Sequence, residues 1–239
     1  STTTVTLEAG SGAVAIKGIG TDIGNVTIDG SGGVTLNGSI TTAGGNIDIN
    51  DATTLATGAI TLTTANGTVD FASTIDGAQN FDISSGAGAV TITGTIGGDV
   101  ALATLDINDS SGAGTISLKD IGDTNTQGVT GTSNIGNDTT VTLDLGGTTY
   151  KTDAVTYTTK AGENIDLTGG ADTTFTTSND GITFGTGTIE MADGSNLIVD
   201  PGTSGGAIDL TAGVMGTSSE NITLTAGTGT VVIGAVGTG

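Results

Sequence analysis

The sequence predicts an all-β protein, specifically a right-handed parallel β-helix (a β-solenoid) with coils of about 20–21 residues. Three observations lead to this prediction. Short apolar–polar–apolar triplets recur along the whole chain, and each is typical of a strand whose outer residues point to one side. Turn-forming residues, including 44 glycines, separate the triplets. Corresponding triplets also recur at a nearly constant spacing, which indicates a solenoid.

The predicted strands are short, and most are bounded by Gly, Asn, Asp, Ser or Thr. No window shows the i, i+3, i+4, i+7 pattern of an amphipathic helix, so we expect almost no helix. In chain order the triplets are residues 5–7, 14–16, 26–28, 34–36, 47–49, 60–62, 69–71, 81–83, 90–92, 105–107, 116–118, 141–143, 155–157, 165–167, 182–184, 189–191, 197–199, 208–210, 222–224 and 231–233.

Two triplets, the turn between them and one further apolar residue form a phrase that the chain repeats. Residues 80–98 (NFDISSGAGAVTITGTIGG) show it most clearly. The spacing from Val5 to Val26 is 21 residues, and from Val26 to Ile47 it is again 21. A solenoid coil of two or three short strands fits this length. The phrase begins at Val5, Val26, Ile60, Phe81, Leu105 and Ile222, and it closes at Ile19, Ile40, Ile75, Ile96, Ile121 and Val236.

A β-sandwich, or two in tandem, is the alternative fold, because its strands also recur every ~8 to 12 residues with turns between them. Sandwich strands are usually longer than these triplets, which are too short to give a hairpin meander a stable face. The phrases also resemble one another closely, whereas sandwich strands occupy different environments. Both points favour the solenoid.

An asparagine stands directly before a triplet at six places, and two explanations stay open. Asparagine tolerates the left-handed backbone conformation that a corner requires. Alternatively, some of these side chains form an amide ladder from coil to coil, for which Asn25 and Asn46, one period apart, are the best pair. The six residues are Asn25, Asn46, Asn80, Asn164, Asn196 and Asn221.

We expect residues 1–239 to form a single continuous solenoid segment, irregular or looped around 120–138, where apolar residues become sparse. Most of the aromatic residues follow, which predicts a wider coil or a lateral excursion there. Pro201 lies in a turn sequence, Asp-Pro-Gly. The aromatic residues concerned are Tyr150, Tyr157, Phe175 and Phe184.

The two ends of the chain resemble each other. Residues 4–22 align without a gap with residues 221–239, and nine of the nineteen positions are identical. Either both segments are good copies of the short phrase, or the chain carries a second, long period that leads from position 4 to position 221. In the second case the chain is part of a longer tandem-repeat protein. Neither end resembles a cap, and an uncapped solenoid end exposes strand edges, so we expect each end to continue or dock.

The charge balance excludes several partner classes. The chain has 25 acidic and 4 basic residues and a formal net charge of −21. Nucleic acid and anionic membrane surfaces need a basic face, so neither is an expected partner. No apolar run approaches the ~18 residues that a membrane span requires, so we expect no membrane insertion.

The sequence offers little catalytic chemistry, because it has no His, Cys or Arg to supply a general base, a thiolate or an anion clamp. We predict no enzymatic activity and assign no catalytic, cofactor-binding or metal-binding residue. Calcium is the one ligand to consider, because oxygen-only turns suit it. A solvated acidic turn explains the same residues, which are Asn108–Asp109, Asp120 to Asp123 and Asn179–Asp180.

Residues 58–98 (GAITLTTANGTVDFASTIDGAQNFDISSGAGAVTITGTIGG) resemble the β-strand repeats of filamentous-haemagglutinin-like surface proteins and giant bacterial adhesins. The Gly-Ala-Gln turn at 77–79 and the Ala-Gly-x-Gly-x-Val phrase carry the resemblance, and residues 166–177 and 221–234 have the same character. The resemblance implies an extracellular or cell-surface bacterial parallel β-helix. Such a protein acts as a rod, adhesin stalk or matrix fibre, and no catalytic residues are implied.

These observations predict a structural extracellular rod, a segment of a large repetitive adhesin or matrix fibre. One alternative is a self-assembling surface-layer or fibre subunit that stacks end to end. Another is an adhesin module that binds a glycan or receptor, for which 120–138 and 150–184 are the candidate surfaces. The expected partners are neighbouring repeats or copies of the chain end to end, together with surface glycans or other cells.

Overall fold

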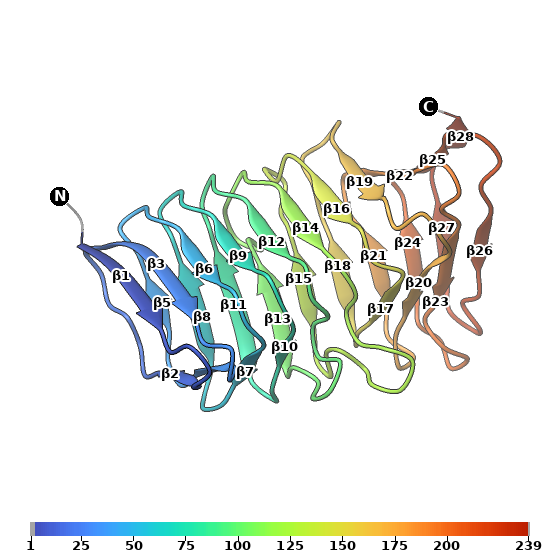
Figure 1. Ribbon diagram of the computed structural model, residues 1–239. Helices are drawn as coiled ribbons and strands as arrows, with labels where there is room; N and C mark the ends of the chain where they lie inside the picture. The colour runs from blue at the N-terminus through green and yellow to red at the C-terminus, as the bar shows by residue number, and fades with distance from the viewer. Residues whose placement is uncertain (1–2, 239) are drawn as a thin grey trace.

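The protein is a β-solenoid in the computed structural model, which describes residues 3–238. All strand pairs of the described residues are parallel, and these residues contain no helix. The chain winds in stacked coils, with its two termini at opposite ends of an elongated molecule (Figure 1). The predicted fold class is therefore confirmed.

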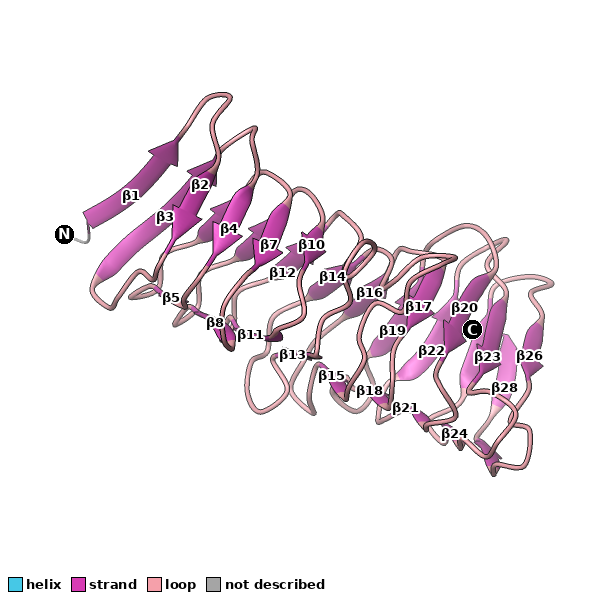
Figure 2. Ribbon diagram, turned by 90° about the horizontal axis from the view of Figure 1, so that it is seen from below, coloured by secondary structure: helices cyan, strands magenta, loops and turns pink. Residues whose placement is uncertain are grey.

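Each coil passes three faces in a fixed order, which we name face A, face B and face C (Figure 2). Face A is one sheet of eleven strands. In stacking order they are β1 (Thr3–Glu8), β3 (Ile23–Asp29), β6 (Ile47–Ile49), β9 (Val69–Phe71), β12 (Val90–Ile92), β14 (Ile116–Leu118), β16 (Leu143–Leu145), β19 (Asn164–Leu167), β22 (Thr188–Met191), β25 (Val214–Gly216) and β28 (Val236–Thr238).

Face B consists of two four-stranded sheets, which single β-bridges join through Ile75, Ile96, Ile121 and Tyr150 in turn. The first sheet holds β2 (Val14–Ile16), β4 (Val34–Leu36), β7 (Thr53–Leu55) and β10 (Ile75–Asp76), and the second holds β17 (Thr149–Lys151), β20 (Thr173–Thr176), β23 (Leu197–Asp200) and β26 (Ile222–Leu224).

Face C is a sheet of nine strands, which Ile19 extends by a single bridge to Ile40. Its strands are β5 (Ile40–Thr41), β8 (Ile60–Thr63), β11 (Asn80–Ser84), β13 (Thr104–Ile107), β15 (Ser133–Ile135), β18 (Val155–Tyr157), β21 (Ile182–Phe184), β24 (Ile208–Leu210) and β27 (Val231–Ile233).

The coil length follows from the register of face A. Val5 pairs with Val26 and Val26 with Ile47, so the first two steps have the length that the sequence predicts. The two longest steps lead from Val90 to Ile116 and from there to Leu143, because longer connections enter these coils. Over the ten steps of face A the mean coil is about 23 residues long, within the range of solenoid repeats.

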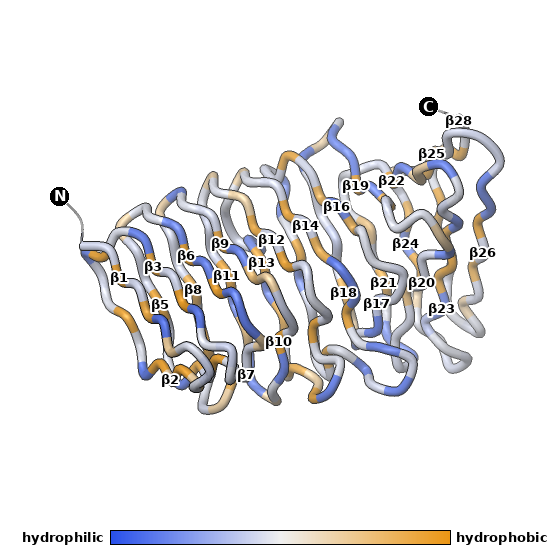
Figure 3. The backbone as a smooth tube through the Cα atoms, viewed as in Figure 1, coloured by the Kyte–Doolittle hydropathy of each residue, from blue (hydrophilic) through white to orange (hydrophobic). Residues whose placement is uncertain are grey.

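The core is a thin apolar column inside the three faces. Strands alternate between buried and half-buried residues, and the buried ones are mainly Ile, Val and Leu. Figure 3 shows the same alternation as hydrophobic and hydrophilic segments along each coil. The four aromatic side chains expected in a wider coil or a lateral excursion, Tyr150, Tyr157, Phe175 and Phe184, are buried in this column and pack on one another. They lie in coils longer than the first two, because Tyr150 pairs with Phe175 and Tyr157 with Phe184, so the wider coil describes them and the lateral excursion does not.

Two local predictions need correction. The strand expected at 141–143 lies at Leu143–Leu145, and Val141 is exposed. The segment 120–138 is more regular than expected, because Ile121 bridges on face B and β15 pairs on face C. Val129 also bridges to Leu102, so the irregular part is limited to residues 122–128. Pro201 lies just outside β23, as its turn sequence predicts.

Most of the six asparagines before triplets form hydrogen bonds between coils, although not as a simple amide ladder. The Asn25 amide oxygen accepts the Asn46 backbone N–H (3.0 Å), and the Asn46 amide oxygen accepts the Thr68 N–H (3.1 Å). Amide-to-amide contact occurs between Asn196 and Asn221, at 3.3 Å. None of the six has a positive φ, so the left-handed-corner explanation is wrong for them.

The repeated phrase does not keep to one face. Its three parts lie on faces A, B and C when it begins at Val5 or Val26. They lie on faces C, A and B when it begins at Phe81. They lie on faces B, C and A when it begins at Ile222. The two similar ends of the chain therefore differ in phase by one face.

Candidate functional site

The outer surface of the rod carries stacked acidic side chains, which the register of the sheets brings together. On face A, Asp48 pairs with Asp70 in the next coil. Farther along the same face Asp144, Asp166 and Glu190 occupy three successive strands. Outward side chains in register lie one strand spacing apart, about 4.8 Å, so these carboxylates repel one another.

Burial and like charges raise the pKa of several of these carboxylates. Partial burial is the main cause at Asp166, with the charges of Glu190 and Asp144 adding to it. The pKa of Asp48 is raised by partial burial and by Asp70. On face C the pKa of Asp82 is raised in the same way, by burial and by two further aspartates. The surface therefore holds carboxylates that protonate more readily than free ones.

Two corner pairs extend this pattern. A hydrogen bond with Asp51 is the main cause that raises the pKa of Asp29. A hydrogen bond with Asp180 likewise raises the pKa of Asp153. A hydrogen bond between two carboxyl groups requires a proton on one of them, which explains the direction of both shifts.

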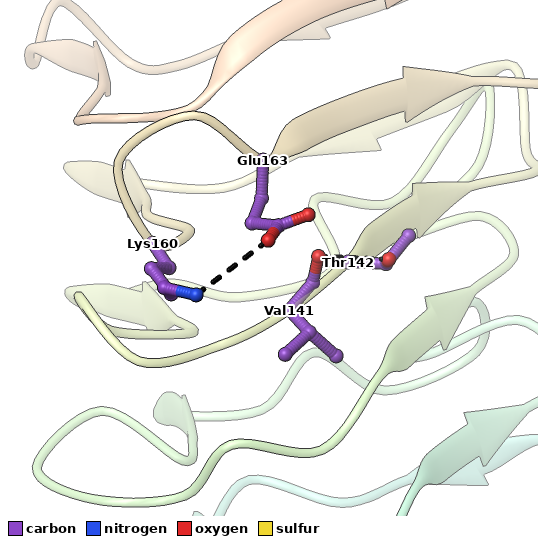
Figure 4. Close-up of polar contacts among 4 residues, drawn as sticks. All are labelled: Val141, Thr142, Lys160 and Glu163. Carbon is purple, nitrogen blue, oxygen red and sulfur yellow. Dashed lines mark hydrogen bonds and ion pairs between the residues drawn. The ribbon is translucent and has the colours of Figure 1, made fainter.

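Positive charge does little to balance these groups. The one ion pair among residues 3–238 joins the Lys160 Nζ to a Glu163 carboxylate oxygen at 3.7 Å (Figure 4). Both side chains are largely exposed, so the pair contributes little to stability. The Val141 and Thr142 side chains shown beside it lie in the irregular connection that precedes β16.

A polar groove of about 430 Å³ lies beside face C, where the two longest coils meet. Asn134, Asn137, Asp109 and Asp138 line it, together with threonines of the following coil. Asn137 is buried and held in place, because its amide nitrogen donates to the Asn108 and Gly112 carbonyls. The groove presents carboxylate, amide and hydroxyl groups, which can bind the hydroxyl groups of a neutral ligand.

The segment 120–138, one of the two candidate binding surfaces, is held against the rod. The Asp123 carboxylate accepts the N–H groups of Asn125 and Thr126 at 2.7 and 2.6 Å, which lowers its pKa and closes a tight turn. The Ser178 hydroxyl donates to the Gln127 side chain at 3.1 Å and joins the segment to a later coil. The other candidate surface, 150–184, offers no aromatic platform, because its aromatic side chains are in the core.

The turns considered for calcium use their oxygens inside the fold. The Asn108 amide oxygen accepts the Ser85 N–H at 2.8 Å. One Asp120 oxygen accepts the N–H groups of Thr148 and Thr149. The Asn179 amide oxygen accepts the Ser204 N–H at 2.9 Å. Between residues 3 and 238 no three carboxylates gather as a set of metal ligands.

A structural motif at the corner between faces C and A is not evident from the triplets. Thr42, Thr64 and Ser85 each donate a hydroxyl hydrogen bond of 2.6 Å to the carbonyl of the glycine three residues later. All three hydroxyl groups are in buried residues. The signal in the sequence is a Thr or Ser followed at the third position by Gly, which recurs once in every coil of this part of the chain.

Residues 3–238 contain no helix and therefore none long and apolar enough to cross a bilayer. Comparison of the chain with models of known protein families, with curated proteins and with solved structures gave no match.

Proposed function

We propose that this chain is a structural extracellular rod, a segment of a large repetitive bacterial surface adhesin or matrix fibre. The observation that carries the proposal is the unbroken parallel stack, in which face A continues through eleven strands. Hydrogen bonds between coils run along the axis of the rod, so load along that axis is shared by all three faces.

The acidic sides favour this role. A net charge of −21 keeps neighbouring rods apart, because like charges on their sides repel. The free edges of a sheet are the surfaces that promote aggregation, and in a solenoid they lie only at its two ends. The rod therefore extends along its axis without associating sideways.

The resemblance of residues 58–98 to filamentous-haemagglutinin-like repeats supports the extracellular location. The chain has no cysteine, and its aromatic residues in the core are inaccessible to solvent. Such a chain presents few reactive groups outside the cell, where proteins are not repaired.

Immunogold labelling of intact cells of the source organism tests the proposal. Antibodies against residues 3–238 should label the surface or surface filaments before the cells are permeabilised. Labelling that appears only after permeabilisation would overturn the extracellular role, whatever the shape of the protein.

The groove beside face C favours a second candidate function, a module that binds neutral glycans. It is lined by groups that can bind sugar hydroxyls, and both of the longest coils contribute to it. A glycan array with the intact chain tests this function. Binding that Asn134→Ala abolishes would support it, and an array without any bound glycan would exclude it for the glycans present.

A further inference from the structure

Each end of the rod is a ramp, because the chain climbs one strand spacing of about 4.8 Å for every passage around the three faces. At the N-terminal end the lowest strand is β1 on face A, followed by β2 on face B and Ile19 on face C. At the C-terminal end the last three strands are β26 on face B, β27 on face C and β28 on face A. The first ramp thus begins on face A and the second on face B.

Both ramps expose residues that are buried in every inner coil. Val231 and Ile233 point inward on β27 but are 43% and 41% exposed, and Val236 on β28 is 58% exposed. At the other end Val5, Leu7 and Val14 are only partly buried. In the inner coils the residues at these positions are covered by the neighbouring coil.

The two ramps fit each other in one orientation. When the second copy is turned by one face, its β1 lies on β26 of the first copy, its β2 on β27 and its Ile19 on Val236. Every strand position between the two copies is then filled. Without a turn, β1 lies on β28, and the positions above β26 and β27 stay empty. A turn of two faces leaves the position above β26 empty.

The outlines of the two end coils match in the same orientation. At the N-terminal end Val14 follows Val5 by nine positions, and Ile19 follows Val14 by five. At the C-terminal end Val231 follows Ile222 by nine positions, and Val236 follows Val231 by five. The long and short sides therefore coincide only when face A of one copy lies over face B of the other.

The backbone groups of the two edges are complementary as well. In this rod the backbone N–H of an inward-pointing residue donates to a carbonyl of the next coil, that of the residue just before its paired residue. Leu197, for example, pairs with Ile222, and its N–H donates to the Asn221 carbonyl (2.9 Å). By the same rule the Ile222 N–H faces the next position along the axis. The Val14 N–H already donates to the Gly33 carbonyl (3.0 Å) within its own copy. The backbone N–H and C=O groups of the alternate residues of β2 therefore point away from that coil, along the axis toward the other copy.

Charge opposes contact along the acidic sides but places no like-charge pair across the ends. Residues 221–239 contain no Asp, Glu or Lys, although the whole chain has a net charge of −21. The facing coil contributes Glu8, Lys17 and Asp22, which meet uncharged residues in this orientation. No pair of like charges would oppose the contact.

From these observations we propose that a second copy of this chain seats on the C-terminal end of the first, turned by one face, with β1 on β26, β2 on β27 and Ile19 on Val236. The proposal takes the structural rod as its starting point and names its axial partner.

Cysteine cross-linking tests the orientation, because the chain contains no cysteine of its own. Thr6 and Thr223 are exposed on β1 and β26 and would lie in register, about one strand spacing apart, within the range of a disulfide. Mild oxidation of the double variant Thr6→Cys/Thr223→Cys should give a ladder of covalent multimers on non-reducing gels.

Two matched variants represent the other orientations. Thr6→Cys/Gly237→Cys tests the seating without a turn, and Thr6→Cys/Val232→Cys tests the turn of two faces. Neither should form a ladder under the same conditions, although circular dichroism should show the same folded β content. A ladder that is equally strong in all three variants, or absent from all three, would overturn the proposal.

A blocking variant provides a second measurement. Val231→Asp places a charge on the C-terminal ramp, where the side chain is already exposed, so the inner coils should remain folded. In the background of Thr6→Cys/Thr223→Cys it should abolish the ladder, and an unchanged ladder would contradict the proposed contact. Surface labelling of cells does not depend on these results, so the extracellular role and the end-to-end contact can fail separately.

Discussion

At the scale of single residues, the coils are joined by side chains that take over backbone hydrogen bonds. Asn108 is the clearest case, because it is buried and has a φ of 49°. Its amide oxygen accepts the Ser85 N–H at 2.8 Å, and its amide nitrogen donates to the Ser85 hydroxyl at 2.9 Å. The side chain therefore completes the hydrogen bonding of the preceding coil at a buried corner.

Replacement of Asn108 should reveal both of its roles. Asn108→Ala leaves the buried Ser85 N–H without a partner and puts alanine at a positive φ, so it should lower the free energy of unfolding by about 1–3 kcal/mol or more. Asn108→Gly loses the same hydrogen bonds without the conformational strain. Urea denaturation should therefore rank the wild type above Asn108→Gly, with Asn108→Ala last.

The stacked carboxylates should make the rod more stable in mild acid. The pKa values of Asp48, Asp82 and Asp166 are raised in the folded state, so protonation favours folding. Their contribution is fully present below the unfolded value of about 4 and is lost as the pH rises through the folded values. The Glu220 pKa is lowered to about 2, mainly by its hydrogen bond with the Ser218 backbone N–H. Ionised Glu220 therefore stabilises the folded state at neutral pH, and this stabilisation is lost only as the pH falls toward 2.

Denaturation midpoints at about pH 4.5 and pH 7 measure this effect, and the midpoint should be higher at the lower pH. Asp166→Asn removes the central charge between Asp144 and Glu190, so it should raise stability at pH 7 by a few tenths of a kcal/mol and reduce the pH dependence. A wild-type midpoint that falls on mild acidification would contradict the prediction.

The sequence predicts part of this residue-scale pattern and misses the rest for a physical reason. Asp48 and Asp70 lie one coil apart in the sequence, as do Asp144 and Asp166, so the period alone could have paired them. The groove beside face C could not be predicted, because it depends on the two lengthened coils between Val90 and Leu143. The polar connections that lengthen those coils carry no triplets to mark their register.

At the scale of elements, the corner between faces C and A depends on a column of glycines. A Cβ atom on Gly67 would lie 2.2 Å from the Gly45 carbonyl oxygen, and one on Gly88 would lie 1.9 Å from that of Gly67. Gly114 repeats the contact with Gly88 at 1.9 Å. The coils stack closely at this corner because no side chain stands between successive carbonyl groups.

A methyl group in this column should separate the coils locally. Gly88→Ala should destabilise the protein by about 1–3 kcal/mol or more, because the nearest atoms belong to backbone that cannot move freely. Gly20→Ala is the matched control, since no atom outside its chain neighbours lies within 4 Å of its added Cβ and its φ is not in the left-handed region. Thermal unfolding should show a loss for the first variant and little change, or a small gain, for the second.

The element scale also shows where triplet patterns fail. Residues 141–145 (VTLDL) contain two overlapping triplets, and the sequence cannot choose between them. The missed strands β15 and β20 begin with the buried residues Ser133 and Thr173, whose hydroxyl groups have no hydrogen-bond partner. An inward Ser or Thr breaks the apolar–polar–apolar pattern although the backbone still pairs.

At the scale of the whole molecule, stability should depend on position along the axis. Each coil contacts only its two neighbours, so an end coil has half the contacts of an inner one. Val231 and Val236 at the C-terminal end are exposed, whereas the equivalent residues of inner coils are buried. The fold class and the end-coil similarity are visible in the sequence, but the difference in phase of one face is not.

Hydrogen exchange of the chain in dilute solution should follow this gradient. Amides of residues 3–19 and 221–238 should exchange first, and those of β9 to β19 should exchange last. Mass spectrometry of peptides along the chain measures this order. Equal protection from end to end would contradict the description of the ends as open edges, because it would require a neighbour or cap there.

The one-face difference in phase between the two ends also determines what a filament of such rods would present to its surroundings. In the proposed contact each copy would add about 50 Å and rotate the next by one face, so every third copy, after about 150 Å, would return to the first azimuth. The groove of successive copies would trace a wide spiral around the filament. A filament lying on a surface would then present some of its grooves to that surface in any rotational orientation about its axis.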